Sequence, residues 1–358
     1  MSFSMQQVSV YVGFCLSFMI NTLLMYMIRK KTTKQLGSYV YLMISFSVFE
    51  LIFSTVDVLN QPMIFVNEGE FLFFSTNPLH LNVFLAKHFN LINFACSGII
   101  ISLLAIHFFY RLMAIQGNQK WLRHFEMPKF FIWIAIFVVF GLEWYLATLF
   151  LGDSGDTVCE VGIDGLIKNF DADPSYTVFI GFKYHVTTND NVTTYCRNSI
   201  VLAMILLKIV LISCTIVTYC GYRTWRKIRS KKGTVSRRTL DMQRQFFRAL
   251  VVQTLIPAFL LYLPLTTMLI APIFMADLQI LDVVIQVAFV SYPILDPIAV
   301  LIIVRDYRRA IKGFVDDHFW KPFLGGISLI LPWIRNTRAI TSPPISTIQQ
   351  PTIPRFIY

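Results

Sequence analysis

Three polar residues interrupt long apolar stretches at positions where a polar or charged group is costly. Asn21, Glu50 and Asp296 each lie within such a stretch. An ionisable side chain inside a membrane costs about 2.5–3.5 kcal/mol on insertion scales, so it is expected to face a partner or a water-filled cavity. One interpretation of the three groups is a static set of hydrogen bonds between helices.

A further ionisable residue, Lys208, lies deep in another apolar stretch. It lies about nine residues from the predicted outer end, or roughly 14 Å into a helix, which is too deep for its ammonium group to reach the interface comfortably. Contact with a ligand and a structural ion pair with Glu143 or Asp282 both explain such a lysine. A retinal Schiff base does not, because the last apolar stretch, where that chemistry needs its lysine, contains none.

Sequence motifs for catalysis are absent from the chain. It has no His-Glu-x-x-His pattern, no paired aspartates in a protease setting and no glycine-rich phosphate loop. We therefore expect neither an enzyme nor a cofactor. The competing functional class is a small-solute channel or carrier in which Lys208, Glu143 and Asp282 form a conduction path.

The elements that must position these residues are seven apolar stretches. A hydrocarbon core of roughly 30 Å requires about 20 mostly apolar residues per crossing helix. The hydrophobic fraction of 56% and the charged fraction of 14% agree with this, because soluble domains carry about 25% charged residues. We expect an all-α membrane protein, a seven-transmembrane helix bundle. Its helices are predicted at residues 8–28, 39–59, 83–109, 130–149, 199–222, 246–270 and 278–304.

Basic residues predict the orientation, since Lys and Arg remain on the cytoplasmic side. The segments outside the helices carry, in chain order, none, four, none, four, three, nine, none and eight of them. The N-terminus is therefore predicted outside and the C-terminus inside, which excludes the seven-helix sensory channels with a cytoplasmic N-terminus. The net charge of +11 then faces anionic lipid and cytosolic partners, and no binding to nucleic acid is expected. Residues 1–315 form the predicted membrane domain, and residues 316–358 a flexible cytoplasmic tail.

The outer segment 150–198 has seven acidic and three basic residues and is predicted to be a small acidic lid. It contains Cys159 and Cys196, and the other four of the six cysteines fall within or at the inner ends of helices. Only these two meet an oxidising compartment, so a disulfide between them is expected; two free thiols are the alternative. The same segment contains Asn191-Val192-Thr193, an acceptor for N-glycosylation.

Five blocks of sequence lie at matching places from the first inner loop to the end of the last helix. They are residues 35–50, 107–111, 253–257, 291–297 and 305–311. Together they resemble nematode seven-transmembrane chemoreceptors of the Str class, over nearly the whole chain except the tail. The resemblance implies a rhodopsin-like, G-protein-coupled receptor for an odorant or pheromone, with a heterotrimeric G protein as partner. It also implies the plasma membrane of a sensory neuron, in its ciliary part.

The resemblance extends to the polar residues. Rhodopsin-like receptors keep an Asn, an acid and an Asn or Asp at sites similar to Asn21, Glu50 and Asp296, and this implies that the three form an activation network.

Prolines mark the movable parts of the predicted bundle. Pro257 and Pro264 lie seven residues apart on one face of the sixth helix and permit a kink there. Pro297 follows Asp296 in the seventh helix and resembles a switch known from related receptors, although Val300 replaces its usual Tyr. Prolines without a mechanistic role are the alternative.

The inner face carries the predicted contacts with the G protein. Arg111 closes the third helix where related receptors keep an Arg that meets the G protein, although Tyr110 replaces the acid that usually precedes it. A lipid-facing anchor is the alternative for Arg111. Residues 305–315 are predicted to form an amphipathic helix on the inner leaflet, with Arg308 and Arg309 facing the phosphates.

The ligand is expected in the outer half of the bundle, beneath the acidic segment. Small-molecule sites combine an apolar wall with a few polar contacts. The candidates for those contacts are His88, Asn93, Lys208, Tyr262 and Gln286.

Overall fold

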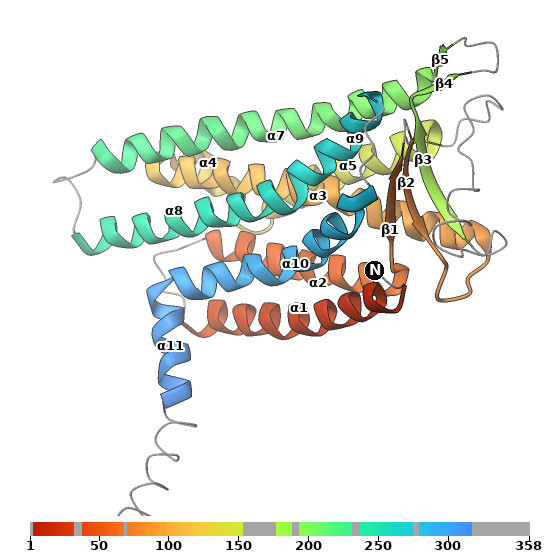
Figure 1. Cartoon of the computed structure of the whole chain (residues 1–358). Coiled ribbons are helices and arrows are strands. Elements are labelled where there is room, and N and C mark those ends of the chain that lie inside the picture. The colour runs from red at the N-terminus through yellow and green to blue at the C-terminus, as the bar shows by residue number, and fades with distance from the viewer. Residues whose placement is uncertain are drawn as a thin grey trace, which may run out of the picture. The chain divides into compact units, whose positions relative to one another are not determined.

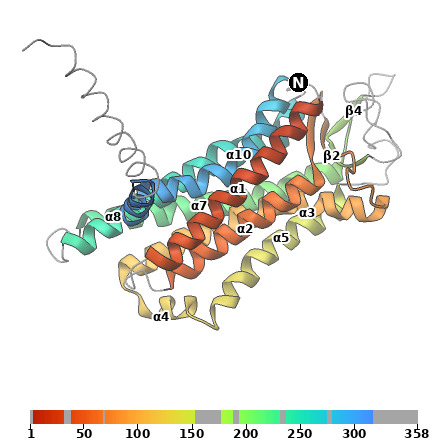
Figure 2. The ribbon, with the colours of Figure 1, turned by 90° about the horizontal axis from the view of Figure 1, so that it is seen from below.

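The computed structural model describes residues 3–31, 38–67, 70–152, 177–187, 193–230, 237–274 and 279–316. Seven helices within these ranges are long and apolar enough to cross a membrane, which confirms the predicted seven-helix bundle. Six of them are α1 (Phe3–Lys31), α2 (Tyr39–Asn60), α3 (Val83–Gln116), α5 (Phe130–Leu151), α7 (Arg197–Ser230) and α10 (Gln279–Ile303). Short α4 (Gln119–Leu122) follows α3. Figures 1 and 2 show the long helices running alongside one another.

The sixth crossing is divided by a change of helix type. α8 (Arg237–Pro257) passes into a π-helical turn, η3 (Ala258–Tyr262), and then into α9 (Leu263–Ile270). Pro257 ends α8, and Pro264 lies in the first turn of α9. A proline cannot donate the backbone hydrogen bond that a continuous α-helix needs, and π-helical turns often occur at functional sites. The π-helical turn lies between Pro257 and Pro264, the two prolines at which the sequence predicts a kink.

The central helix of the bundle is α3. Of its most apolar stretch 89% is buried, compared with 28% for α1 and 22% for α5. The Asn82 side chain accepts a hydrogen bond from the Leu85 amide at 2.8 Å and so caps the outer end of α3. Gly117, with φ of 72°, ends the helix in the left-handed conformation that glycine adopts without strain.

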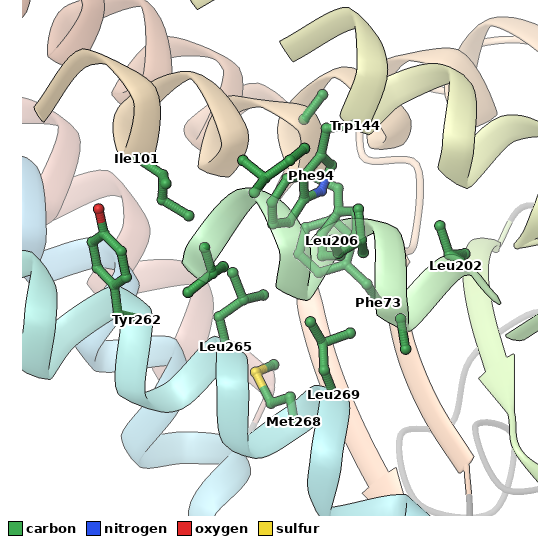
Figure 3. Close-up of a cluster of buried hydrophobic side chains, with 14 of the residues drawn as sticks. Phe73, Phe94, Ile101, Trp144, Leu202, Leu206, Tyr262, Leu265, Met268 and Leu269 are labelled. Carbon is green, nitrogen blue, oxygen red and sulfur yellow. The ribbon is translucent and has the colours of Figure 1, made fainter. Parts of the chain in front are cut away.

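Close contact between α3 and α5 organises the largest apolar cluster. Trp144 of α5 is completely buried and meets Phe94 of α3 at a ring distance of 5.7 Å. A Cβ atom on Gly98 would lie 2.9 Å from the Trp144 ring, so the indole requires a glycine opposite it. Leu202 and Leu206 of α7 complete this side of the cluster, as Figure 3 shows.

A three-stranded antiparallel sheet closes the end of the bundle at which α1 begins (Figure 1). β1 (Met63–Asn67) and β2 (Glu70–Ser75) follow α2, and β3 (Val178–Lys183) precedes α7. The register pairs Ile64 with Phe73 and Phe73 with Ile180. Two outer connections are thus joined by main-chain hydrogen bonds, where the sequence predicted only loops.

Both faces of this sheet are apolar and buried. Phe71 and Phe73 join the large cluster of the bundle, whereas Leu72 and Phe74 belong to a separate cluster on the opposite face. A strand buried on both faces is a continuous apolar run without alternation. Such a run resembles a piece of helix in sequence, which is why periodicity does not predict these strands.

Two further short strands follow, β4 (His185–Thr187) and β5 (Thr193–Tyr195), which pair with each other. Tyr184, between β3 and β4, donates a hydrogen bond of 2.7 Å to the Leu269 carbonyl of α9. Burial raises the pKa of this phenol. The outer segment before α7 is therefore attached to the outer end of the sixth crossing.

The chain from Arg308 onward forms a second compact unit. Its described part belongs to α11 (Arg305–Val315), with Arg308 and Arg309 exposed. The helix is present where an amphipathic helix was predicted. Its position on the membrane stays a prediction, and the tail beyond residue 316 lies outside the described residues.

Candidate functional site

A small cavity lies within the bundle directly beneath the sheet. The volume open to the centre of a water molecule is about 20 Å³, which is room for one or two waters. Its apolar wall comes from α2, β1, β2, α3, α9 and α10, and Figure 3 shows part of it around Phe73, Phe94, Leu265 and Met268. The apolar lining residues are Phe53, Pro62, Ile64, Phe73, Phe94, Leu265, Met268 and Phe289.

Four polar residues face this cavity: Asp57, Asn93, Ser97 and Gln286. The Asp57 carboxyl is 7% exposed and receives one long hydrogen bond of 3.5 Å, from the Asn93 amide. Gln286 donates a hydrogen bond of 2.6 Å to the Pro62 carbonyl, which joins α10 to the sheet. None of the lining residues in the described part of the chain is a lysine, arginine or histidine. The cavity therefore presents an acid and amides in apolar surroundings, without a cation of its own.

Asparagine and serine side chains connect α1, α2 and α10 deeper in the bundle. Asn21 of α1 donates a hydrogen bond of 3.0 Å to the Pro293 carbonyl of α10. The Ser17 and Ser54 hydroxyls are 2.7 Å apart and link α1 to α2. The Pro293 carbonyl is available because the residue four positions on, Pro297, has no N–H to donate to it. The carbonyl oxygen that Pro297 leaves without a donor in its own helix thus accepts a hydrogen bond from a neighbouring helix.

A buried pair of acids lies beside these groups. Glu50 and Asp296 are each 1% exposed. The Gln253 amide of α8 donates to the Asp296 carboxyl at 2.8 Å. The Glu50 carboxyl faces Asn21, Tyr292 and Asp296, yet no described residue meets it at full hydrogen-bond geometry. Two facing acids in this environment require a proton or water between them.

Arg111 lies at the inner end of α3 and is 6% exposed, so it does not face lipid. Its guanidinium carbon lies 5.5 Å from the centre of the Tyr39 ring. Tyr39 also stacks on Tyr110, at a ring distance of 5.3 Å. An arginine held over an aromatic face is attracted by the ring electrons. The lipid-anchor alternative for Arg111 is therefore wrong, and aromatic rings hold the side chain inside the bundle.

The family model for serpentine type seven-transmembrane GPCR chemoreceptors, Str, matches residues 6–312. The chain belongs to this family. It is similar to serpentine receptor class r-10 of Caenorhabditis briggsae, with 29% identity over 85% of this chain and 88% of that protein. The Caenorhabditis elegans protein of the same name is also 29% identical, over 85% of this chain and 89% of its own length. G-protein coupled receptor str-33 of C. elegans is 24% identical, over 86% of this chain and 90% of its own length.

Membership in the Str class establishes a multi-pass chemosensory G-protein-coupled receptor, and the class is not one of enzymes. The resemblance carried by the five sequence blocks is thereby confirmed.

The five residues predicted to contact a ligand in this Str receptor do not all meet at the cavity. Asn93 and Gln286 line it. His88 makes a hydrogen bond to the Tyr145 hydroxyl of α5. The Tyr262 hydroxyl lies 3.1 Å from the Ser213 hydroxyl of α7.

Lys208 also lies away from the cavity. Its ammonium group pairs with Glu143 of α5, and the two side chains are 50% and 34% exposed. This half-exposed pair on the side of the bundle agrees with the second explanation of Lys208, a structural ion pair with Glu143. The proposed conduction path included the same pair, and the side chain of its third member, Asp282, lies outside the described residues.

Sequence reasoning missed Asp57 and Ser97 of the cavity. Asp57 follows Glu50 by seven residues, so it lies two turns farther out on the same face of α2. The rule that identified Glu50, an ionisable group inside an apolar stretch, applies equally to Asp57.

The predicted covalent features of the outer segment lie partly outside the described residues. Cys196 is buried and disulfide-bonded. The four cysteines placed in or at the ends of helices are free. Cys159 and Asn191 lie outside the described residues, so the pairing with Cys159 and the glycosylation stay predictions.

Proposed function

We propose that this receptor binds a small odorant or pheromone in the cavity beneath β1 and β2. The observation that carries the proposal is the Asp57 carboxyl, which is buried among apolar side chains with Asn93 and Gln286 beside it. A few polar groups within an apolar wall are typical of small-molecule sites. Because the space in this state is so small, the ligand is a molecule of few heavy atoms, or the cavity widens as it binds.

The signal passes from the cavity to the acid pair below it. Asp57 and Glu50 share one face of α2, and Asp296 connects α10 to α8 through Gln253. A ligand that moves α2 or α10 changes the surroundings of both acids. Because α8 is continued by a π-helical turn, its inner part can move without breaking the outer part of the crossing.

A heterotrimeric G protein binds at the inner face. Its proposed contacts are Arg111, the basic residues of the segment 223–244, and Arg308 and Arg309, all of which belong to segments predicted on the cytoplasmic side. Positive charge on that side attracts an acidic partner and steers its docking. The receptor acts in the plasma membrane of a sensory neuron, in its ciliary part.

The test is a screen of small volatile molecules on cells that express the receptor with a calcium or cyclic-nucleotide reporter. Each agonist found is then applied to Asn93→Leu and Gln286→Leu receptors. Loss of one hydrogen bond of about 0.5–1.5 kcal/mol should raise the half-maximal concentration about two- to tenfold, for agonists with a matching polar group. Lys208→Met is the matched control, since it removes a polar group outside the cavity.

Agonist-gated current that persists without any G protein would contradict receptor coupling. Equal shifts for cavity and control variants would contradict the ligand site alone.

A further inference from the structure

An apolar groove runs along the side of the bundle between α7 and α8. Its volume is about 410 Å³. Val217 and Thr218 of α7 form one wall, Val251 and Leu255 of α8 form the other, and Phe108 of α3 forms the floor. All of these residues belong to membrane-crossing stretches. The groove therefore opens toward lipid and not toward water.

Gly221 leaves room above the Phe108 ring at the floor of the groove. Gly221 has no side chain, and a Cβ atom there would lie 3.0 Å from the Phe108 ring. The Thr254 hydroxyl donates to the Leu250 carbonyl of its own helix at 2.7 Å, so it does not need a partner from an occupant. The lining thus offers an occupant apolar contact and almost no unsatisfied polar group.

The inner end of the groove carries a positive charge. Trp225 lines it and is 44% exposed. The Arg229 guanidinium lies over this indole, with its central carbon 4.7 Å from the ring centre. Arg229 is one turn beyond Trp225, in the last turn of α7. Trp and Arg at such a level contact the headgroup region of a bilayer.

We infer that an anionic phospholipid of the cytoplasmic leaflet occupies this groove. One acyl chain lies between α7 and α8, over Gly221 and Phe108, and the headgroup phosphate lies at Arg229. The apolar lining matches the chain, and the arginine matches the phosphate. A lipid in the groove contacts α8 on the cytoplasmic side of the π-helical turn η3. It therefore acts on the part of the sixth crossing that can move.

The experiment uses the full-length receptor in phosphatidylcholine vesicles that contain a small fraction of phosphatidylserine with a photoreactive acyl chain. After illumination, the cross-linked peptides are mapped by mass spectrometry. We expect cross-links to concentrate in residues 217–225 and 247–255. The same photoreactive chain on phosphatidylcholine should label these residues at least threefold less.

Two pairs of variants locate the chain and the headgroup. Thr218→Trp fills the groove and should lower its labelling at least fivefold, whereas Leu211→Trp adds the same ring two turns away on exposed α7 surface and should not. Arg229→Gln should lower phosphatidylserine labelling to the phosphatidylcholine level. Arg223→Gln removes one charge from the same helix end, where Arg223 lies over Tyr219 instead, and should preserve the preference. Thr254→Trp fills the groove from α8 if Thr218→Trp does not reach the vesicles folded.

Labelling spread evenly over exposed helix faces, or unchanged by both filling variants, would overturn the inference. So would equal labelling by the two lipids in the unmodified receptor. If the filling variants abolish G-protein activation while lipid labelling persists, the groove contacts protein and not lipid.

Discussion

The Gln253 amide donates a hydrogen bond of 2.8 Å to the Asp296 carboxyl, and this bond joins α8 to α10 just before the π-helical turn. Replacing Gln253 with Leu keeps the size of the side chain but leaves a buried acceptor without its donor. We expect a loss of about 1–3 kcal/mol in stability, measured by thermal unfolding of the purified receptor. Thr254→Val, which removes only a bond within α8, should cost less. Equal stability of the Gln253→Leu and unmodified receptors would contradict a structural role for the bond.

Lys208 and Glu143 should behave as a coupled pair in stability. In a double-mutant cycle of Lys208→Met and Glu143→Gln, the expected coupling is about 0.6 kcal/mol, the average for polar contacts in membrane bundles. The coupling is small because the unfolded helices in the membrane also find polar partners for these side chains. Selectivity among agonists should stay the same. A change of selectivity in Lys208→Met alone would instead place the ammonium group against the ligand.

Arg111→Ala should leave surface expression intact and lower agonist-driven nucleotide exchange more than about tenfold, the effect of losing about 1.4 kcal/mol of contact with the G protein. Arg111→Lys should restore little, because an ammonium group lacks the planar guanidinium that stacks on Tyr39. Arg123→Ala, which removes an exposed cation from the next inner segment, serves as the control. Normal nucleotide exchange in the Arg111→Ala receptor would mean that the arginine only packs within the bundle and does not contact the G protein.

The disulfide partner of Cys196 should be Cys159. Peptide mapping without reduction is expected to recover the two residues in one linked pair of peptides. Cys159→Ser, Cys196→Ser and the double variant should lose similar stability, about 2–4 kcal/mol. Recovery of both residues as alkylated thiols would reject the pairing.

Asn191 should carry an N-linked glycan, since its segment is predicted to be extracellular. Asn191→Gln is expected to reduce the apparent mass by the same amount as enzymatic removal of glycans. An epitope at Met1 should be stained on intact cells. Staining of a C-terminal epitope without permeabilisation would show that the orientation is the reverse of the predicted one.

The seven helices could be predicted because an apolar run of sufficient length determines a crossing almost by itself. The helix ends could not. α7 continues through the basic turns to Ser230, eight residues beyond its predicted end at Tyr222. Hydropathy stops where the chain leaves the hydrocarbon, whereas backbone hydrogen bonding continues into the headgroup region.

Only some residues of the candidate site could be predicted from the sequence, because hydropathy again gives incomplete information. Hydropathy places Lys208 at a depth in the membrane, but it does not determine the direction of the side chain around the helix axis. Neighbouring helices determine that direction, and the bundle turns Asn93 and Gln286 inward but Lys208 toward Glu143. The β1–β2 hairpin did leave a signal, since two aromatic-rich runs flank a short segment containing Gly69.

In the sheet over the cavity, main-chain groups determine the backbone geometry, whereas side chains determine the chemistry of the cavity wall. Main-chain hydrogen bonds set the register of β1, β2 and β3, and these bonds do not depend on which side chains the strands carry. The side chains of Ile64 and Phe73, in contrast, form part of the cavity wall. An exchange at either position would therefore alter the size or polarity of the cavity while the scaffold above it kept its geometry. If the cavity binds the ligand as proposed, a single substitution in this roof changes which ligand fits without rebuilding the helices below it.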